Sequence, residues 1–139
     1  MNPHLRMYRQ QQAQHEVQQA SPVQLVVMLY DRAISLSRQS LLHMEKGQVK
    51  EKGMALNQVI EILSELQRAL NLEEGGTIAQ RLDDLYTFLL QQVTVANLRN
   101  DPQPISTVLN VLEELREGWR GVQKMVQDGA VAEVGAKQG

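Results

Sequence analysis

Histidine, aspartate and glutamate are the side chains in this sequence that could bind a metal ion or transfer protons. The three histidines are His4, His15 and His43. None has a second ligand three or four residues further on, as a helical metal pair requires, and the Glu-x-x-His pairs of di-metal bundles do not occur. The spacing therefore favours solvated histidines and predicts no metal site.

Adjacent carboxylates and a glycine pair are the other candidates for chemistry. Glu73-Glu74 and Asp83-Asp84 are neighbours in sequence, so the two members of each pair do not share a helix face. Gly75-Gly76 precedes a predicted helix, as a phosphate loop does, but no Lys-Ser or Lys-Thr follows. The chain has no cysteine, which excludes disulfides and thiolate sites. We therefore predict that the protein is not an enzyme and binds no cofactor.

Length and charge limit the remaining classes of function. A chain of 139 residues fits one domain with a real core. The formal net charge of -2 gives no electrostatic footprint for nucleic acid. No run approaches the roughly 18–20 apolar residues that a membrane span needs, and the N-terminus has no apolar signal core. We expect a cytoplasmic protein that neither inserts into membranes nor binds nucleic acid.

Capping residues and glycines mark the limits of the expected helices. Ser21-Pro22-Val23-Gln24 combines a capping box with a proline at the first helical position, and Gly47 provides a left-handed stop. Thr77-Ile78-Ala79-Gln80 is a second capping box, and Asp101-Pro102 marks the last start. The predicted helices span residues 22–46, 48–71, 78–99 and 102–127.

Apolar residues recur every three or four positions in these segments, which is the spacing of core-facing helices. The predicted core stripes are Leu56, Val59, Ile60, Leu63, Leu66 and Leu70; Ile78, Leu82, Leu85, Leu89, Val93 and Ala96; and Ile105, Val108, Leu112, Leu115, Trp119, Val122 and Val126. Because the connections are short, the sequence predicts an all-α fold, an antiparallel up-down four-helix bundle over residues 21–127. Residues 1–20, polar and glutamine-rich, are expected to form a mobile arm, and residues 128–139 a disordered tail.

The first helix has more apolar residues than one core-facing stripe can hold. We assign Val26, Leu29, Ala33 and Leu36 to the bundle seam, with Ser40 and Met44 as further candidates. The surplus residues are Val23, Leu25, Val27, Met28, Tyr30 and Ile34. They cannot all point into a seam roughly 100° wide. The helix could be central in a tight bundle, covered by the N-terminal arm, buried in a homodimer, or open as a groove for a partner's amphipathic helix.

Three blocks of sequence resemble the FliS family of flagellar secretion chaperones. The first is A-S-P-x-x-L-x-x-M-L-Y-D-x-A from Ala20 to Ala33. The second comprises Ile78 to Tyr86 and Ala96 to Asp101, and the third is Leu115-Arg116-Glu117-Gly118-Trp119. Tyr8 and Val17 match an N-terminal tyrosine and valine. The resemblance covers about residues 5–127, in order and with family-like spacing.

The resemblance implies a cytoplasmic export chaperone that holds the C-terminal segment of newly made flagellin and keeps it from polymerising before export. It also implies contacts, in some members, with the export gate component and the anti-sigma factor. We expect client-binding residues among Tyr8 and Val17 in the arm, Leu25, Met28 and Tyr30 on the first helix, and Asp31, Tyr86 and Asn97 at motif positions. Tyr86 and Asn97 could instead make structural contacts between helices, and Trp119 is expected in the core.

Two further hypotheses stay open at this stage. Tyr8 and Val17 could cover the client groove until flagellin displaces them, or could merely staple the start of the first helix. The alternative functions are a homodimeric structural bundle and a regulatory adaptor for the anti-sigma factor.

The sequence departs from the family pattern at three places. Glycine is common at the position of Arg32, asparagine at that of Arg81, and basic residues at those of Gln91-Gln92. Arg32 would alter the local path of a client.

Overall fold

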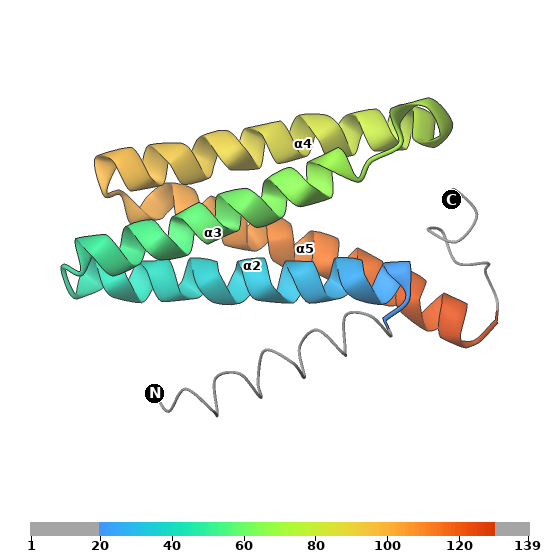
Figure 1. Cartoon of the computed structure of the whole chain (residues 1–139), viewed down its shortest axis with the longest axis horizontal. Coiled ribbons are helices and arrows are strands. Elements are labelled where there is room, and N and C mark those ends of the chain that lie inside the picture. The colour runs from blue at the N-terminus through green and yellow to red at the C-terminus, as the bar shows by residue number, and fades with distance from the viewer. Residues whose placement is uncertain (1–19, 130–139) are drawn as a thin grey trace, which may run out of the picture. The chain divides into compact units, whose positions relative to one another are not determined.

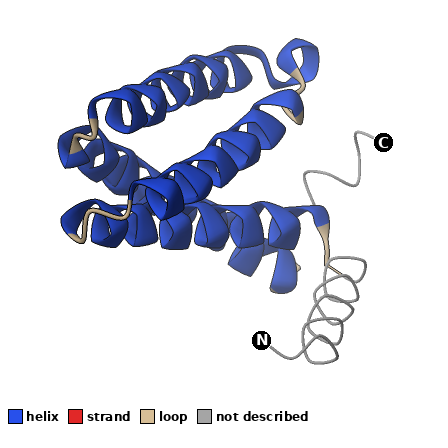
Figure 2. Ribbon diagram, turned by 60° about the vertical axis from the view of Figure 1, so that its left-hand side comes forward, coloured by secondary structure: helices blue, strands red, loops and turns tan. Residues whose placement is uncertain are grey.

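A computed structural model describes residues 20–129 of the chain, and all of its regular structure there is helical (Figures 1 and 2). The helices are α2 (Pro22–Glu45), α3 (Val49–Arg68), α4 (Leu72–Arg99) and α5 (Pro102–Gln127). Within the described part there is no strand. The all-α prediction is confirmed. Most of the predicted arm and tail lies outside the described residues.

The start of α2 is fixed by the predicted capping box. The Gln24 backbone N–H donates to Ser21 Oγ at 3.2 Å, and the Ser21 N–H donates to Gln24 Oε1 at 2.8 Å. These two bonds satisfy backbone donors that a helix start otherwise leaves unpaired. At the other end α2 stops at Glu45, and Gly47 adopts a φ of 70°, the left-handed conformation that glycine takes without steric cost.

The start of α4 differs from the prediction, because the helix begins at Leu72 and not at residue 78. Asn71 caps a short helical turn by accepting the Glu74 N–H on Oδ1 at 3.1 Å. Gly76 then breaks the helix, with φ 56° and ψ −131°, before α4 continues. The turn folds back tightly, since a Cβ atom on Gly75 would lie 2.5 Å from Ala79 Cβ. The glycine pair therefore forms a kink, and it lies inside α4.

Gly76→Ala is expected to lower the free energy of unfolding by about 1–3 kcal/mol. The positive φ at Gly76 is a conformation that side chains with a Cβ atom rarely adopt. Gly118→Ala is the matched control, because Gly118 is helical and a Cβ there meets nothing within 4 Å. That control should raise stability by about 0.5–1 kcal/mol. Urea unfolding of both variants measures the difference; similar shifts would show that the conformation of Gly76 imposes no strain.

The chain divides into two units, and Leu29–Gly118 is the larger. In this unit the helices alternate in direction and form an antiparallel four-helix bundle (Figure 1). Polar contacts tie the helices together: Arg32 donates to Gln58 Oε1 at 2.8 Å, Arg38 to Glu113 Oε1 at 2.7 Å, and Gln67 to Thr87 Oγ1 at 2.8 Å. These bonds join α2 to α3, α2 to α5 and α3 to α4.

The core of this unit confirms most residues of the predicted stripes and corrects the stripes of α2 and α4. On α2 the seam runs through Tyr30 and Ile34, which are fully buried, whereas Leu29 is partly exposed. The prediction that Tyr30 and Ile34 belong to a surplus face is therefore wrong. On α4 the predicted first member of the stripe, Ile78, is 73% exposed, and Tyr86 is buried in the seam.

The second unit comprises Met1–Met28 and Trp119–Gly139, of which residues 20–28 and 119–129 are described. Val23 and Val27 are buried there, one helical turn apart on α2. Trp119, Val122 and Val126 are partly exposed on α5.

Across residues 20–129, no helix combines the length and the hydropathy that crossing a bilayer requires.

Candidate functional site

Tyr30 and Tyr86 meet in the bundle core and join α2 to α4. The two side chains are 0% and 2% exposed, and their hydroxyl groups form a hydrogen bond at 2.5 Å. Burial raises the pKa of the Tyr86 phenol above its ordinary value of 10.0, and the neighbouring Tyr30 hydroxyl adds to the effect. Both residues were predicted to touch a client. The structure places them where they hold two helices together.

Asp31 lies next to Tyr30 in sequence but points to α5. Arg116 donates from Nη1 to Asp31 Oδ1 at 3.1 Å, and the Arg116 side chain is largely covered. Arg116 Nε is buried and has no hydrogen-bond partner, so the guanidinium bears a desolvation cost at this position. The three sequence blocks that resemble the family are therefore joined here. Tyr30 and Asp31 belong to the first block, and they contact Tyr86 of the second block and Arg116 of the third.

Asn97 lies at the C-terminal end of α4, where a buried lysine reaches it from α3. Lys52 is 4% exposed, and its Nζ donates to the Asn97 carbonyl oxygen and to Asn100 Oδ1, each at 3.1 Å. Asn100 adopts the left-handed conformation that ends the helix. The ammonium group thus compensates the unpaired carbonyl and the negative end of the α4 dipole. The structure gives the Asn97 carbonyl a structural contact.

Lys52→Met is expected to lower the free energy of unfolding by about 1.5–3 kcal/mol, the range for hydrogen bonds to charged groups. Methionine keeps the apolar stem but leaves the Asn97 carbonyl without its donor. Lys50→Met on the exposed side of α3 is the control, and we expect little change there. Thermal unfolding of both variants decides the matter, and equal melting temperatures would remove Lys52 from the set of stabilising contacts.

The other predicted client residues on α2 are Leu25 and Met28, and both are partly exposed. Arg32, at the position where the resemblance has glycine, is exposed and donates to Gln58 on α3. Tyr8 and Val17 lie outside the described residues.

Burial falls along α4 and α5 towards the end of the Leu29–Gly118 bundle where α3 joins α4. The α5 seam is buried at Leu112 and partly exposed at Leu115. The α3 seam stays buried as far as Leu66, and Leu70, which follows the end of α3 at Arg68, is partly exposed. Leu115 faces inwards by its helical spacing, so its exposure means that the core is less closed at this end.

The α4 seam shows the same loss of burial. Leu89 and Tyr86 are buried, whereas Leu82, one turn nearer the α3–α4 connection, is partly exposed. Ala79 is buried beneath the turn at Gly75, which it contacts. We call Leu70, Leu82 and Leu115 the open end.

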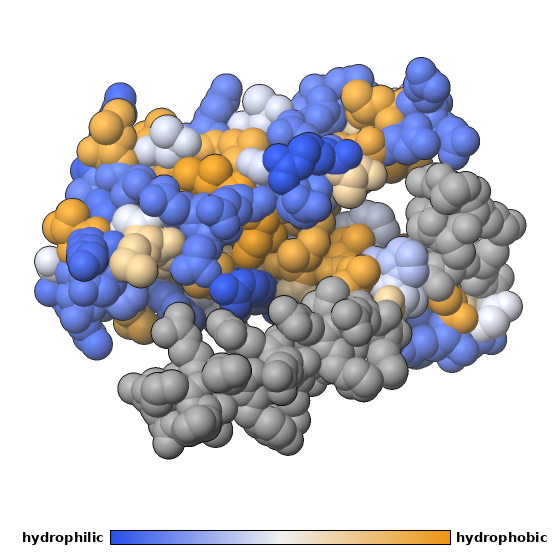
Figure 3. All heavy atoms as spheres, viewed as in Figure 1, coloured by the Kyte–Doolittle hydropathy of each residue, from blue (hydrophilic) through white to orange (hydrophobic). Residues whose placement is uncertain are grey.

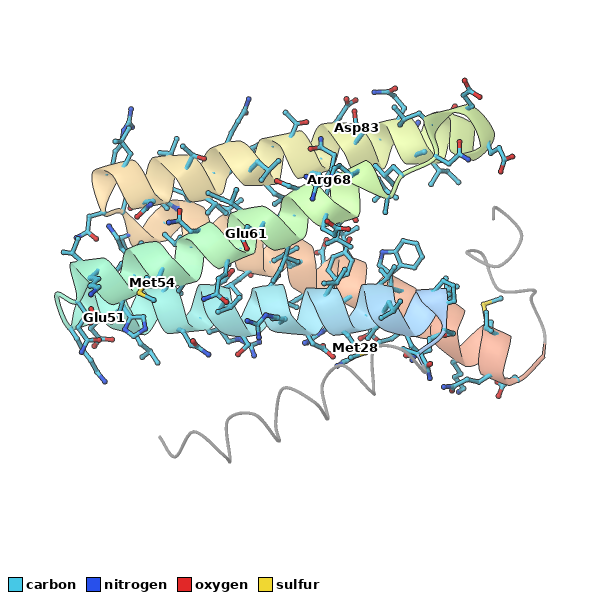
Figure 4. All side chains as sticks on the ribbon, viewed as in Figure 1. Met28, Glu51, Met54, Glu61, Arg68 and Asp83 are labelled. Carbon is cyan, nitrogen blue, oxygen red and sulfur yellow. The ribbon has the colours of Figure 1, made fainter. Side chains whose placement is uncertain are left out.

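Figure 3 shows apolar side chains among polar ones on one face of the molecule. The outward side of α3 carries exposed polar groups such as Glu51, Glu61 and Arg68 (Figure 4). The open end is a set of partly exposed leucines on a bundle whose outer surface also carries polar groups.

The three residues of the open end are leucines, which carry no polar group. Within residues 20–129, no cluster of three or more histidine, aspartate or glutamate side chains could hold a metal ion. Partly exposed leucines suit an apolar side chain of another polypeptide. Fold and surface together define a four-helix-bundle protein whose candidate site is a surface for binding apolar groups.

Comparison with known proteins gives the family. A family model described as flagellar protein FliS matches residues 4–126. The flagellar secretion chaperone FliS of Vibrio cholerae is 33% identical over 135 residues, covering 97% of this chain and 99% of its own length. That of Salmonella typhimurium is 38% identical over 119 residues, covering 85% and 88%. The chain belongs to the FliS family of flagellar secretion chaperones, and this membership supports a role as a flagellar export chaperone.

A solved structure shows the same fold. The crystal structure of a flagellar chaperone from bacteria superposes with a TM-score of 0.70 at 20% identity, covering 88% of this chain and 98% of that one. At this identity the likeness concerns the fold alone.

Two features of the site escaped the sequence prediction. Lys52 lies one helical turn before Leu56, the first residue of the apolar stripe on α3, and this position in line with the stripe is the signal of its buried role. The open end has no signal in the stripes themselves, because Leu82 and Leu115 continue them without a break.

Proposed function

We propose that this chain binds the C-terminal segment of flagellin in the cytoplasm, keeps it from polymerising prematurely and holds it ready for the flagellar export apparatus. One observation carries the proposal: Leu82 on α4, Leu115 on α5 and Leu70 after α3 are partly exposed, whereas the next seam residues Leu66, Leu89 and Leu112 are buried. Membership of a secretion chaperone family supplies the kind of client.

The energetics favour an apolar site for such a client. A segment that folds on binding has to offset its ordering cost by burying apolar surface. Burying about 1,500 Å² is worth on the order of 40 kcal/mol gross, and chain ordering with association consumes most of it. The partly exposed leucines give such a segment apolar side chains to cover. A bound segment would also cover the leucines that the bundle leaves partly exposed.

The geometry favours a helical segment as the bound form. Leu82 and Leu115 come from α4 and α5, and Leu70 lies in the connection after α3. Side chains so arranged can receive the apolar stripe of one amphipathic helix, whose anchors recur every three or four residues. Membership of the FliS family suggests flagellin as the client, and the sequence resemblance implies that its C-terminal segment is the part that binds.

Calorimetric titration of the full chain with the C-terminal segment of flagellin from the same organism tests the proposal. We expect one-to-one binding with a large negative heat-capacity change, and far-UV circular dichroism should show new helix in the mixture. The central domain of the same flagellin is the control and should give no heat. A chain that sediments as a tight dimer without client, and binds no segment, would favour the homodimeric alternative instead.

A further inference from the structure

Helix α4 carries two parallel lines of residues at alternating three- and four-residue spacing. The buried line contains Ala79, Leu82, Tyr86, Leu89, Val93 and Ala96. The second line starts one residue earlier and keeps the same spacing throughout. It contains Ile78, Arg81, Leu85, Phe88, Gln92, Val95 and Arg99, and we call it the second stripe. This is the spacing by which helices pack side by side in coiled coils.

The second stripe is accessible along its length. Ile78 is 73% and Phe88 40% exposed, while Leu85 and Val95 are partly exposed. An apolar residue at these positions gains nothing from the solvent. Four of them at coiled-coil spacing make a face that a further helix could cover.

The hydrogen bonds from α3 reach another side of α4. Gln67 donates to the Asp83 carbonyl oxygen and to Thr87 Oγ1, and Lys52 donates to the Asn97 carbonyl oxygen and to Asn100 Oδ1. Successive residues are about 100° apart around a helix, so Thr87 and Asn100 each lie about 100° away from their neighbours in the second stripe. The stripe is therefore separate from the side of α4 on which α3 packs.

Charge identifies the chemistry of a partner. Arg81 and Arg99 are exposed and lie about 27 Å apart along the helix, one towards each end of the stripe. Neither forms an ion pair with another residue of the described part. Gln92 is polar and lies between Phe88 and Val95. A polar residue at one core position of a coiled coil fixes the register of the partner.

A second copy of this chain is a poor occupant. Antiparallel self-pairing centred near residue 90 would bring Arg81 of one copy against Arg99 of the other. Parallel pairing would bring each arginine against itself. Like charges directly opposite each other are destabilising, so the stripe disfavours its own dimer.

We propose that the second stripe docks an amphipathic helix of another protein, with apolar anchors for Leu85, Phe88 and Val95 and acidic side chains opposite Arg81 and Arg99. This site is separate from the one proposed for the flagellin segment, because the open end lies on inward-facing seams and the second stripe lies on the outer flank of α4. The chaperone would then hold its client and an acidic helical partner at once.

Two synthetic peptides of about three heptads test the proposal against the full chain. Both carry leucines at the heptad core positions and a central glutamine; one has glutamates at the ends of the stripe and the other lysines. By fluorescence anisotropy the glutamate peptide should bind at least about tenfold more tightly, with an affinity that falls as salt is added. Equal binding of the two peptides overturns the proposal.

Variants of the chain locate the binding face. Arg81→Glu with Arg99→Glu should reverse the preference in favour of the lysine peptide, and Phe88→Asp should abolish binding of either. Leu98→Asp is the control, because Leu98 is 83% exposed and lies outside the stripe. Loss of binding by this control, with Phe88→Asp unaffected, contradicts the assignment. The arginine exchange changes only exposed side chains, so it remains decisive if Phe88→Asp fails to fold.

The flagellin segment separates this proposal from the one for the open end. The double arginine variant should bind the flagellin segment as the unchanged chain does. The glutamate peptide should bind equally well with the flagellin segment present. Competition between the glutamate peptide and the flagellin segment would show that the second stripe is part of the client site, which would overturn the proposal of a separate surface. Failure of flagellin binding alone would leave the peptide result intact.

Discussion

Replacing Tyr86 by alanine is expected to lower the free energy of unfolding by about 3–5 kcal/mol, the range for truncating a large buried aromatic residue. The Tyr86 ring is buried against α2, and the bundle would collapse only partly into the space that it leaves. The change also leaves the buried Tyr30 hydroxyl without the bond to Tyr86. Urea unfolding followed by circular dichroism measures the loss.

Tyr86→Phe separates the hydroxyl from the ring. It keeps the packing, so we expect a smaller loss of about 1–2 kcal/mol. Phe88→Leu on the same helix changes a partly solvated aromatic and is the matched control, with little expected effect. If Tyr86→Phe were as damaging as Tyr86→Ala, the hydrogen bond and not the ring would be the main stabilising contact.

The raised pKa of Tyr86 gives the same variant a pH signature. Above about pH 10 the unfolded chain loses the Tyr86 proton while the folded chain keeps it, so stability falls by up to about 1.4 kcal/mol per pH unit. The contribution is complete below pH 10 and is lost as the pH rises. In Tyr86→Phe this part of the slope should vanish. Identical slopes for the two proteins would mean that the phenol is not held neutral.

The seam of α2 shows where periodicity fails as a guide. Val26, Leu29, Ala33 and Leu36 have helical spacing, but so do Val23, Val27, Tyr30, Ile34 and Ser37. The sequence prediction assigned the first set to the seam, whereas the structure buries all five residues of the second set together with Ala33 and Leu36. Tyr30 is acceptable in the seam because its hydroxyl has a partner on α4, and that partner is invisible until the helices are placed.

The limits of the helices were more accessible to prediction than the site. Capping side chains act on backbone groups within three residues, so Ser21 and Gln24 could be read from local sequence alone. Asp31 and Arg116 lie far apart in sequence, and only the packing of α2 on α5 brings them together. The resemblance to the FliS family marked Asp31 as a motif position, but the ion pair depends on tertiary structure.

Substitutions at Leu82 and Leu89, on the same seam of α4, should have different effects on stability and on client binding. They occupy equivalent positions on the buried line, but Leu89 is fully buried and Leu82 is partly exposed. Leu89→Ala is expected to cost about 2–5 kcal/mol of unfolding free energy, as buried leucines do. Leu82→Ala should cost less, because solvent already reaches that side chain.

Client binding should show the opposite order. If the open end receives a flagellin helix, Leu82 becomes buried in the complex, and Leu82→Ala should weaken binding at least about tenfold, or 1.4 kcal/mol. Leu89→Ala, titrated at a temperature where it is folded, should bind within a factor of about three. Leu115→Ala, on the facing helix, should behave like Leu82→Ala. If all three variants bind alike, the client lies elsewhere on the bundle, and the exposure of these inward-facing leucines has another cause.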